Sequence, residues 1–359
     1  MRVAVLASSR FPIAEPFAGG LEAHVWHLTR QLKRRGHDVT LFAAPGSDDS
    51  LVADCLQVGQ LALSPLARAD VSMPAELAME EHHAYLSLMI DLISGQAGTF
   101  DLIHNHSLHY LPIAMAPALD TPMVSTLHTP PTPWLESALQ TGAGRRVRMI
   151  AVSEHTAAAW RHVTGPVSVV PNGVDVTCWQ PGPGGGPLIW TGRIVPEKGA
   201  DLAIEAAALA GRPLQLAGPI VDHGFFDRAI APRLGPDVTY LGHLSQAALS
   251  AAVGRAGAAL VTPRWNEPYG LVVAEALACG TPVAAFARGG IPEILTAECG
   301  RLVAADDVAA LAAAIPAVLQ LSRSAARDRA TSTCSLEVMV DRYEAIYREL
   351  LPVKVARAS

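Results

Sequence analysis

Two glutamates, Glu267 and Glu275, stand eight residues apart in the segment PRWNEPYGLVVAEALACGT at 263–281. The pattern is typical of a polar loop after a strand and before a helix, with Glu267 on the loop and Glu275 on the first turns of the helix. There Glu275 can accept hydrogen bonds from two vicinal hydroxyls, such as those of a ribose. An isolated pair of this kind is more often a charge at a helix start and a solvated glutamate, so other residues must support the functional interpretation.

The start of the same helix can bind an anion. Gly270, Leu271 and Val272 would present backbone N–H groups that have no partner inside the helix, at its positive end. A diphosphate suits this geometry, and each such contact contributes about 0.3–1 kcal/mol, or somewhat more when buried. With Glu275 beside them, these groups indicate a diphosphate and a ribose.

Two cations, Arg193 and Lys198, fall in the loop between a strand at 188–191 and a helix at 200–210. Arginine presents a planar fork and lysine a point charge, so the two together can neutralise a leaving diphosphate. Among 27 basic residues a surface pair is the ordinary interpretation. The position between a strand and a helix start favours the diphosphate instead.

Glycines and histidines near the ends of other strands are further candidates. Gly19 and Gly20 precede a helix and, lacking a Cβ, let the backbone approach a phosphate closely; alternatively they form a flexible turn. His128 ends a strand at the carboxyl edge of the sheet. His104 and His106 end the preceding strand, where they could line an acceptor pocket or simply pack.

The elements that must position these residues alternate between strand and helix. A strand at 2–7, a glycine loop, a helix that Gly36 ends and a strand at 39–44 form a βαβ unit, which implies a parallel sheet. Further strands are predicted at 101–104, 122–127, 149–152 and 167–170. After a linker rich in proline and glycine at 175–187, strands are predicted at 188–191, 214–217, 238–241, 258–261 and 283–286.

We therefore expect an α/β protein of two doubly wound, Rossmann-like domains joined by a flexible hinge, a size that 359 residues accommodate. The first domain would span 1–176 and the second 177–335, with a final helix in 336–359. Ligands of such folds bind at the carboxyl ends of the strands, so the cleft between the domains is the expected site.

Composition excludes several classes of function. The net charge of −6 argues against a general nucleic-acid binder. Five scattered cysteines and the absence of a long apolar stretch favour free thiols in a cytoplasmic protein. No phosphate-binding P-loop motif and no His/Cys cluster with zinc spacing occurs, so no cofactor or metal is expected.

Six segments in this order resemble the family-four retaining glycosyltransferases (glycosyltransferase group 1), which have the GT-B fold. They are GG at 19–20, DLIHNH at 101–106, STLHT at 125–129, PNGVD at 171–175, GRIVPEKG at 192–199 and the Glu267 to Glu275 block. The resemblance implies transfer of a sugar from a nucleotide diphosphate sugar to an acceptor hydroxyl, with the nucleotide sugar as a substrate. It also implies a final helix that crosses back to the first domain.

The same resemblance implies the roles of individual residues. Arg193 and Lys198 would neutralise the diphosphate, Glu267 would bind sugar hydroxyls, and His128 would lie beside the transferred sugar. Retention in this family is ascribed to front-face attack, without a covalent nucleophile. The chain has no Asp-x-Asp sequence, so a metal on the diphosphate is not expected. UDP with glucose or N-acetylglucosamine is the donor predicted from family frequency.

Several alternatives stay open. A nucleotide-sugar epimerase of the same architecture would convert the donor without an acceptor, and a non-catalytic nucleotide-sugar-binding protein would bind it only. The acceptor could be a sugar, a lipid or a small natural product. Basic clusters at 30–35 and 145–148 leave open a weak peripheral contact with a membrane, although a helix C-terminus also favours positive charge.

Overall fold

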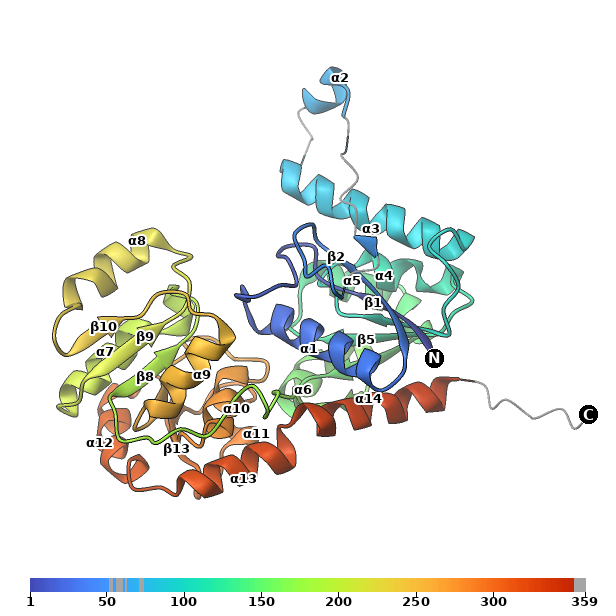
Figure 1. The fold of residues 1–359 in the computed structure, drawn as a ribbon. Coiled ribbons are helices and arrows are strands. Elements are labelled where there is room, and N and C mark those ends of the chain that lie inside the picture. The colour runs from blue at the N-terminus through green and yellow to red at the C-terminus, as the bar shows by residue number, and fades with distance from the viewer. Residues whose placement is uncertain (52–53, 56–60, 62, 71–73, 352–359) are drawn as a thin grey trace, which may run out of the picture.

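In a computed structural model the chain forms two α/β halves, each built on its own sheet (Figure 1). The structure describes residues 1–351 except 52–53, 56–60, 62 and 71–73. Within these residues one sheet has seven strands and the other six, and the pairings between the strands are parallel. The predicted fold class, an α/β protein of two doubly wound domains, is confirmed.

The first sheet has the strand order β3-β2-β1-β4-β5-β6-β7. Its strands are β1 Arg2–Leu6, β2 Asp38–Ala43, β3 Asp54–Cys55, β4 Leu102–Asn105, β5 Met123–Leu127, β6 Val147–Ala151 and β7 Ser168–Val169. Its helices are α1 Gly20–Arg34, α2 Pro65–Arg68, α3 Glu76–Ser94, α4 Leu111–Met115, α5 Pro133–Gln140 and α6 Glu154–Thr164. The order reverses between β1 and β4, and ligands of doubly wound sheets bind beyond such a point.

The second sheet has the order β10-β9-β8-β11-β12-β13. Its strands are β8 Leu188–Thr191, β9 Leu214–Ala217, β10 Val238–Tyr240, β11 Ala259–Val261, β12 Val283–Phe286 and β13 Gly300–Val303. The later helices are α7 Ala200–Leu209, α8 His223–Phe225, α9 Gln246–Arg255, α10 Leu271–Ala278, α11 Ile291–Ile294, α12 Val308–Val318, α13 Arg323–Thr333 and α14 Leu336–Leu350. Single turns of 3-10 or π type are η1 Ala116–Ala118, η2 Ala143–Arg146, η3 Pro196–Lys198, η4 Phe226–Ile230 and η5 Ala231–Arg233.

Both faces of the first sheet are buried, because helices cover each of them. Side chains alternate along a strand, and in β1 Val3 and Val5 join one apolar core while Ala4 and Leu6 join another. Strands buried on both faces carry continuous apolar runs rather than alternating ones. That is why β1, β8 and β12 could be predicted from sequence, whereas β13, whose side chains are partly exposed, was not predicted.

The last helix, α14, leaves the second half and packs along α1 of the first (Figure 1). Tyr343 and Tyr347 are fully buried in the core of the first sheet. The backbone approaches closely where the helix begins, since a Cβ on Gly173 would lie 2.6 Å from the Ser335 carbonyl oxygen. Residues 352–359 of the segment predicted to hold the final helix lie outside the described residues.

A second contact joins the halves at the start of α6. The Glu293 carboxylate accepts hydrogen bonds from the backbone N–H groups of Glu154 at 2.9 Å and His155 at 2.8 Å. Ser153 is the N-cap of α6: its hydroxyl accepts a hydrogen bond from the Thr156 N–H and donates to the Pro268 carbonyl at 2.5 Å. A helix N-terminus thus receives negative charge from the other half of the molecule.

The linker at 175–187 is bonded to the second half, so the prediction of a flexible hinge is wrong over its glycines. The N–H groups of Gly184 and Gly186 donate to the carbonyls of Gly254 and Arg255. A Cβ on Gly182 would lie 2.3 Å from the carbonyl of Gly254. The glycines in this stretch allow close approach to α9 rather than free rotation.

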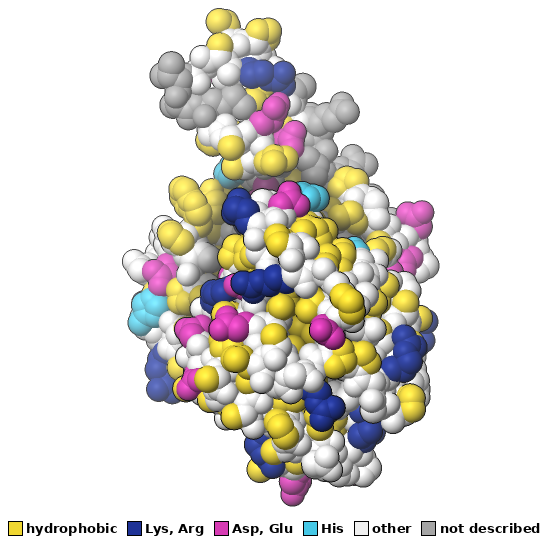
Figure 2. All heavy atoms as spheres, turned by 90° about the vertical axis from the view of Figure 1, so that its left-hand side faces the viewer, with side chains coloured by type: hydrophobic (Ala, Val, Ile, Leu, Met, Phe, Trp, Pro, Cys, Tyr) yellow, Lys and Arg dark blue, Asp and Glu magenta, His cyan; other side chains and the backbone are white. Residues whose placement is uncertain are grey.

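No single helix in the described part of the chain is long and apolar enough to cross a membrane; α12 and α13, bent by 105°, meet that criterion only as a pair. On the face shown in Figure 2, Lys and Arg side chains are interspersed with Asp and Glu rather than gathered into one patch.

Candidate active site

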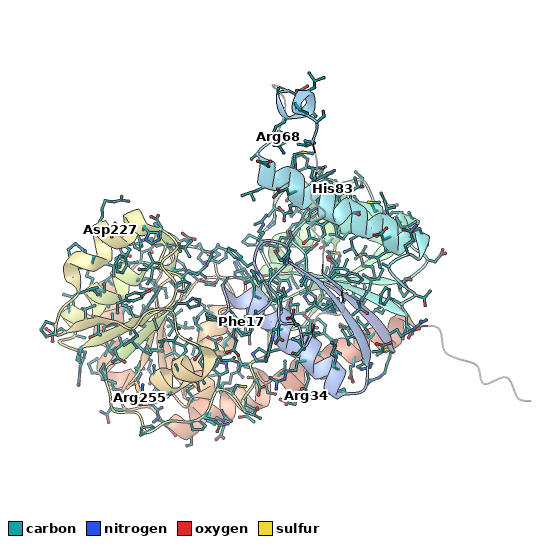
Figure 3. The ribbon with its side chains drawn as sticks, turned by 45° about the horizontal axis from the view of Figure 1, so that its top comes forward. Phe17, Arg34, Arg68, His83, Asp227 and Arg255 are labelled. Carbon is teal, nitrogen blue, oxygen red and sulfur yellow. The ribbon has the colours of Figure 1, made fainter. Side chains whose placement is uncertain are left out.

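The two halves enclose a cleft of about 480 Å³. Figure 3 shows Phe17, from the loop after β1, between the two halves, and its carbonyl accepts a hydrogen bond from His243 Nε2 at 3.2 Å. All the predicted site residues except His104 and His106 line the cleft. They are Gly19, Gly20, His128, Arg193, Lys198, Glu267, Gly270, Leu271, Val272 and Glu275. Their assembly in one place is a finding of the structure; their individual roles remain proposals.

Lys198 and Glu267 form an ion pair on the wall that the second half contributes. Lys198 Nζ lies 2.5 Å from Glu267 Oε1 and 4.8 Å from the centre of the Trp265 ring. The Trp265 indole N–H donates to the same carboxylate oxygen at 2.8 Å. Trp265 therefore holds both partners, one by a cation–π contact and the other by a hydrogen bond. A cation in this position can exchange its carboxylate partner for a diphosphate.

The loop that carries Arg193 and Lys198 is fixed by glycines. Gly199 has φ +70°, and a Cβ there would lie 2.0 Å from the Thr262 carbonyl oxygen. Gly218 has φ +141°, and a Cβ there would lie 1.9 Å from the Gly192 carbonyl oxygen. Both positions need glycine because of conformation and space together. The cations consequently occupy a tightly packed loop.

Helix α10 begins at Leu271, directly at the cleft. Gly270 precedes it with φ +102°, a conformation that favours glycine. From the opposite wall, a Cβ on Gly20 would lie 3.4 Å from Leu271 Cδ2, so the Gly19–Gly20 loop reaches the start of α10. The free backbone N–H groups of this helix start therefore face a narrow space between the halves.

Two cleft carboxyl groups have raised pKa values. Burial raises the pKa of Glu275 to about 8. Burial also raises the pKa of Glu22, on α1, and the effect is partly offset by its backbone hydrogen bond and by the positive charge of Arg193. Glu22 is a cleft residue that we did not predict, because a glutamate in the first turn of a helix is ordinary in sequence. Its proximity to Arg193 depends on how the two halves face each other.

His128 follows β5 and lines the cleft. Its Nε2 lies 2.9 Å from Nδ1 of His106, and burial, with the nearby His24 and His104, lowers the pKa of His128 well below its ordinary value. The imidazole is therefore neutral near pH 7. It can donate or accept a hydrogen bond with a sugar hydroxyl, but it carries no charge.

The structure contradicts the prediction that His104 and His106 line an acceptor pocket. Both are fully buried behind the cleft and outside its lining. His104 has both ring nitrogens engaged, Nδ1 with the Tyr347 hydroxyl at 2.6 Å and Nε2 with Thr126 Oγ1 at 2.8 Å. His104 thereby ties β4 to α14, which is a packing role.

Most of the first basic cluster is engaged in contacts within the chain. Arg35 bonds to Asp341 at 2.6 Å, Lys33 donates to the Leu51 carbonyl at 2.8 Å, and Arg30 lies over the Trp26 ring. Three of the four basic side chains of this cluster thus have partners within the chain.

Comparison with known proteins decides the family. The model described as Glycosyltransferase Family 4 matches residues 18–177, and the model described as Glycosyl transferases group 1 matches residues 187–332. The glycogen synthase of Mycobacterium tuberculosis is 30% identical, over 88% of this chain and 87% of that protein. The chain belongs to the family-4 glycosyltransferases.

This family-4 glycosyltransferase is also 30% identical to the D-inositol 3-phosphate glycosyltransferase of Mycolicibacterium paratuberculosis, over 92% of this chain and 86% of the relative. In fold it is similar to the sucrose-phosphate synthase of Thermosynechococcus elongatus, with a TM-score of 0.76, 22% identity and coverage of 97% and 98% of the two chains. Anabaena HepE in complex with UDP and glucose gives a TM-score of 0.73 at 19% identity, covering 97% and 100%. The enzyme transfers a sugar from a nucleotide sugar.

The raised pKa of Glu275 predicts a pH-dependent cost in stability for this glycosyltransferase. The pKa of Glu275 is 4.5 in its ordinary state and about 8 in the folded enzyme. Between these pH values the folded enzyme retains a proton that the unfolded chain has released. Stability from this group therefore falls as the pH rises through that range. Glu275→Gln removes the titration, so its melting temperature relative to the unsubstituted enzyme should increase from about pH 5 to pH 8.

The matched control is Glu205→Gln on α7, where the carboxylate is exposed. The difference in melting temperature between Glu205→Gln and the unsubstituted enzyme should stay constant across the same pH range. A constant difference for Glu275→Gln as well would contradict the burial of a protonatable carboxyl at this position.

Proposed function

We propose that the enzyme is a retaining, metal-independent hexosyltransferase that takes glucose or N-acetylglucosamine from its UDP derivative and transfers it to an acceptor hydroxyl. The observation that carries the proposal is the convergence of Arg193, Lys198 and the start of α10 in one cleft, with Glu275 one turn further along the helix. The two cations and the free N–H groups would hold the diphosphate, and Glu275 would accept hydrogen bonds from the ribose hydroxyls.

The proposed reaction is the front-face transfer that the resemblance to retaining glycosyltransferases implies. The bond between the anomeric carbon and the diphosphate oxygen breaks while the acceptor oxygen approaches from the same face of the sugar. The acceptor's proton passes to the departing phosphate oxygen, so no side chain needs to form a covalent bond. Arg193 and Lys198 would stabilise the charge that develops on that oxygen, inside a cleft that excludes much of the water.

The sugar would lie between the two halves. Glu267, released from Lys198 by the diphosphate, would accept hydrogen bonds from sugar hydroxyls, and neutral His128 would contact the sugar from the first half. The Gly19–Gly20 loop would close over the phosphates beside Leu271, the residue it already reaches. The acceptor would enter from the first half, where Arg10, Phe11 and Leu108 also line the cleft.

The choice of UDP is supported by Anabaena HepE, a protein of similar fold that holds UDP and glucose in its solved complex. The relatives' printed activities differ in their acceptors, since one is a glycogen synthase and the other acts on inositol 3-phosphate. We therefore propose a hydroxyl acceptor without naming its class. Cys178, Cys279, Cys299 and Cys334 are free thiols, which supports the proposed cytoplasmic location.

The first test is incubation of the purified enzyme with UDP-, GDP- and ADP-sugars, without acceptor or metal. Because water can replace the acceptor, we expect slow release of UDP and an increase in melting temperature with the same nucleotide. A new sugar isomer, still joined to its nucleotide, would support the epimerase instead. Stabilisation without any turnover, even with acceptors added, would support the non-catalytic binder.

Arg193→Ala should lower kcat for the preferred donor by about 100- to 1,000-fold, the loss typical of removing one group that stabilises charge in a transition state. Steady-state kinetics measures this effect. Arg212→Ala, which removes an exposed arginine outside the cleft, is the control and should leave kcat unchanged. Equal rates for the two variants would refute the assignment of Arg193 to the leaving group.

A further inference from the structure

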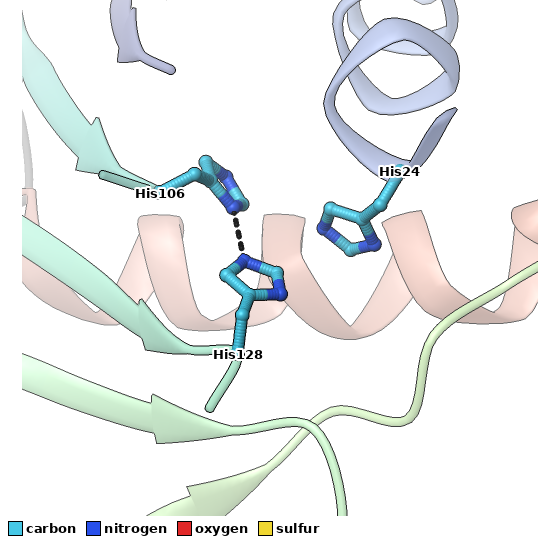
Figure 4. A group of neighbouring side chains, drawn as sticks. All are labelled: His24, His106 and His128. Atoms are coloured by element: carbon cyan, nitrogen blue, oxygen red, sulfur yellow. Dashed lines mark hydrogen bonds between the residues drawn. The ribbon is translucent and has the colours of Figure 1, made fainter. Parts of the chain in front are cut away.

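Three histidines from different elements converge beside the cleft. His24 lies on α1, His106 follows β4 and His128 follows β5 (Figure 4). Each offers a ring nitrogen, and these nitrogens all lie within 4.8 Å of one another. The sequence could not reveal the cluster, because its members are separated by 82 and 22 residues and no local spacing links them.

We propose that His24, His106 and His128 form a binding site for a transition-metal dication of the Zn²⁺ class, with its remaining coordination position open to the cleft. Imidazole suits zinc, cobalt, nickel and copper, whereas magnesium and calcium prefer oxygen. Three histidines and one open position form a recurring zinc geometry.

The hydrogen bonding of the cluster distinguishes it from ordinary packing. His24 is 1% exposed, and neither of its ring nitrogens has a hydrogen-bond partner among the described residues. Nε2 of the fully buried His106 also lacks one. Buried polar atoms in proteins nearly always have a hydrogen-bond partner, so three without one in a single cluster need an explanation. Neighbouring His104, whose two nitrogens are both engaged, is not a ligand.

The distances fit an ion after a small movement. Tetrahedral zinc with nitrogens at 2.0–2.1 Å requires about 3.3 Å between ligand atoms. His106 Nδ1 and His128 Nε2, now 2.9 Å apart, would move slightly apart, and each would bind the ion in place of their hydrogen bond. His24 would move toward them by at most about 1.5 Å, which side-chain rotation can provide.

The charge state of the three imidazole rings is also suited to binding a metal ion. Metal ligation needs neutral imidazole, since a protonated ring has no lone pair to give. Burial lowers the pKa of His24 to about 3 and holds the pKa values of His106 and His128 well below the ordinary value. No net loss of a proton is therefore needed near pH 7; the proton of the His106–His128 hydrogen bond moves to the other nitrogen of its ring.

Occupancy would have a consequence for turnover, and this consequence rests on the proposed function. A metal on His128 would take the ring nitrogen away from the sugar and place a cation beside the sugar's position. Zn²⁺ should therefore inhibit transfer and raise the KM for the donor. Binding of the metal itself does not depend on the donor assignment and can be measured without turnover.

Cobalt(II) provides the direct test because its tetrahedral complexes absorb strongly in visible light. We expect the EDTA-treated enzyme to bind one Co²⁺ per chain with such a spectrum, to release it to Zn²⁺ and to retain it in excess Mg²⁺. His24→Phe should weaken Co²⁺ binding at least about 10-fold, the lower end of the loss caused by removing even an outer partner of a metal ligand. His162→Ala, which removes an exposed histidine, should leave the spectrum unchanged.

His24→Asn serves as a second variant if His24→Phe does not fold, and far-ultraviolet circular dichroism shows whether each variant is folded. No tetrahedral Co²⁺ spectrum, or one that persists in a folded His24 variant, would overturn the proposal. Co²⁺ binding without any nucleotide binding would leave the metal site intact and refute the donor site. Nucleotide turnover without Co²⁺ binding would refute the metal site and leave the donor site intact.

Discussion

The contact of α14 with the first sheet determines how the two halves face each other. Tyr343 and Tyr347 are buried beside β4, and the Tyr347 hydroxyl meets His104 at 2.6 Å. Because α14 follows directly from the helices of the second half, this packing ties the end of the chain back to the first half. Glu293 adds a second connection at the start of α6. The cleft is consequently a product of tertiary contacts that lie outside it.

Inside the cleft the main physical problem is negative charge. Glu22, Glu267 and Glu275 all line the space that a diphosphate would enter. The unliganded enzyme limits their repulsion by pairing Glu267 with Lys198 and by raising the pKa values of the other two through burial. Arg193, Lys198 and the helix start then offer the positive potential that an incoming diphosphate needs. The same arrangement explains why glycines fix the cation loop, since side-chain bulk there would displace both charges.

The sequence predicted what depends on local pattern and could not predict what depends on the meeting of distant segments. Continuous apolar runs located β1, β8 and β12, and the segment at 263–281 located the start of α10. By contrast, Glu22 faces Arg193 only after the two halves have packed together, and His24 meets His106 and His128 only after α1 has packed on the first sheet. His104 was expected in the cleft because it lies at the carboxyl end of its strand, yet its side chain points into the core toward α14. Strand position gives the edge of the sheet but not the face to which a side chain turns.

The central claim is that Arg193, Lys198 and the start of α10 together hold the diphosphate of the donor. A crystal structure of the enzyme with UDP tests it most directly. We predict diphosphate oxygens within hydrogen-bond distance of both cations and of the N–H groups of Leu271 and Val272, with Lys198 separated from Glu267. A diphosphate bound elsewhere, or one that leaves the Lys198–Glu267 pair intact, would contradict the account.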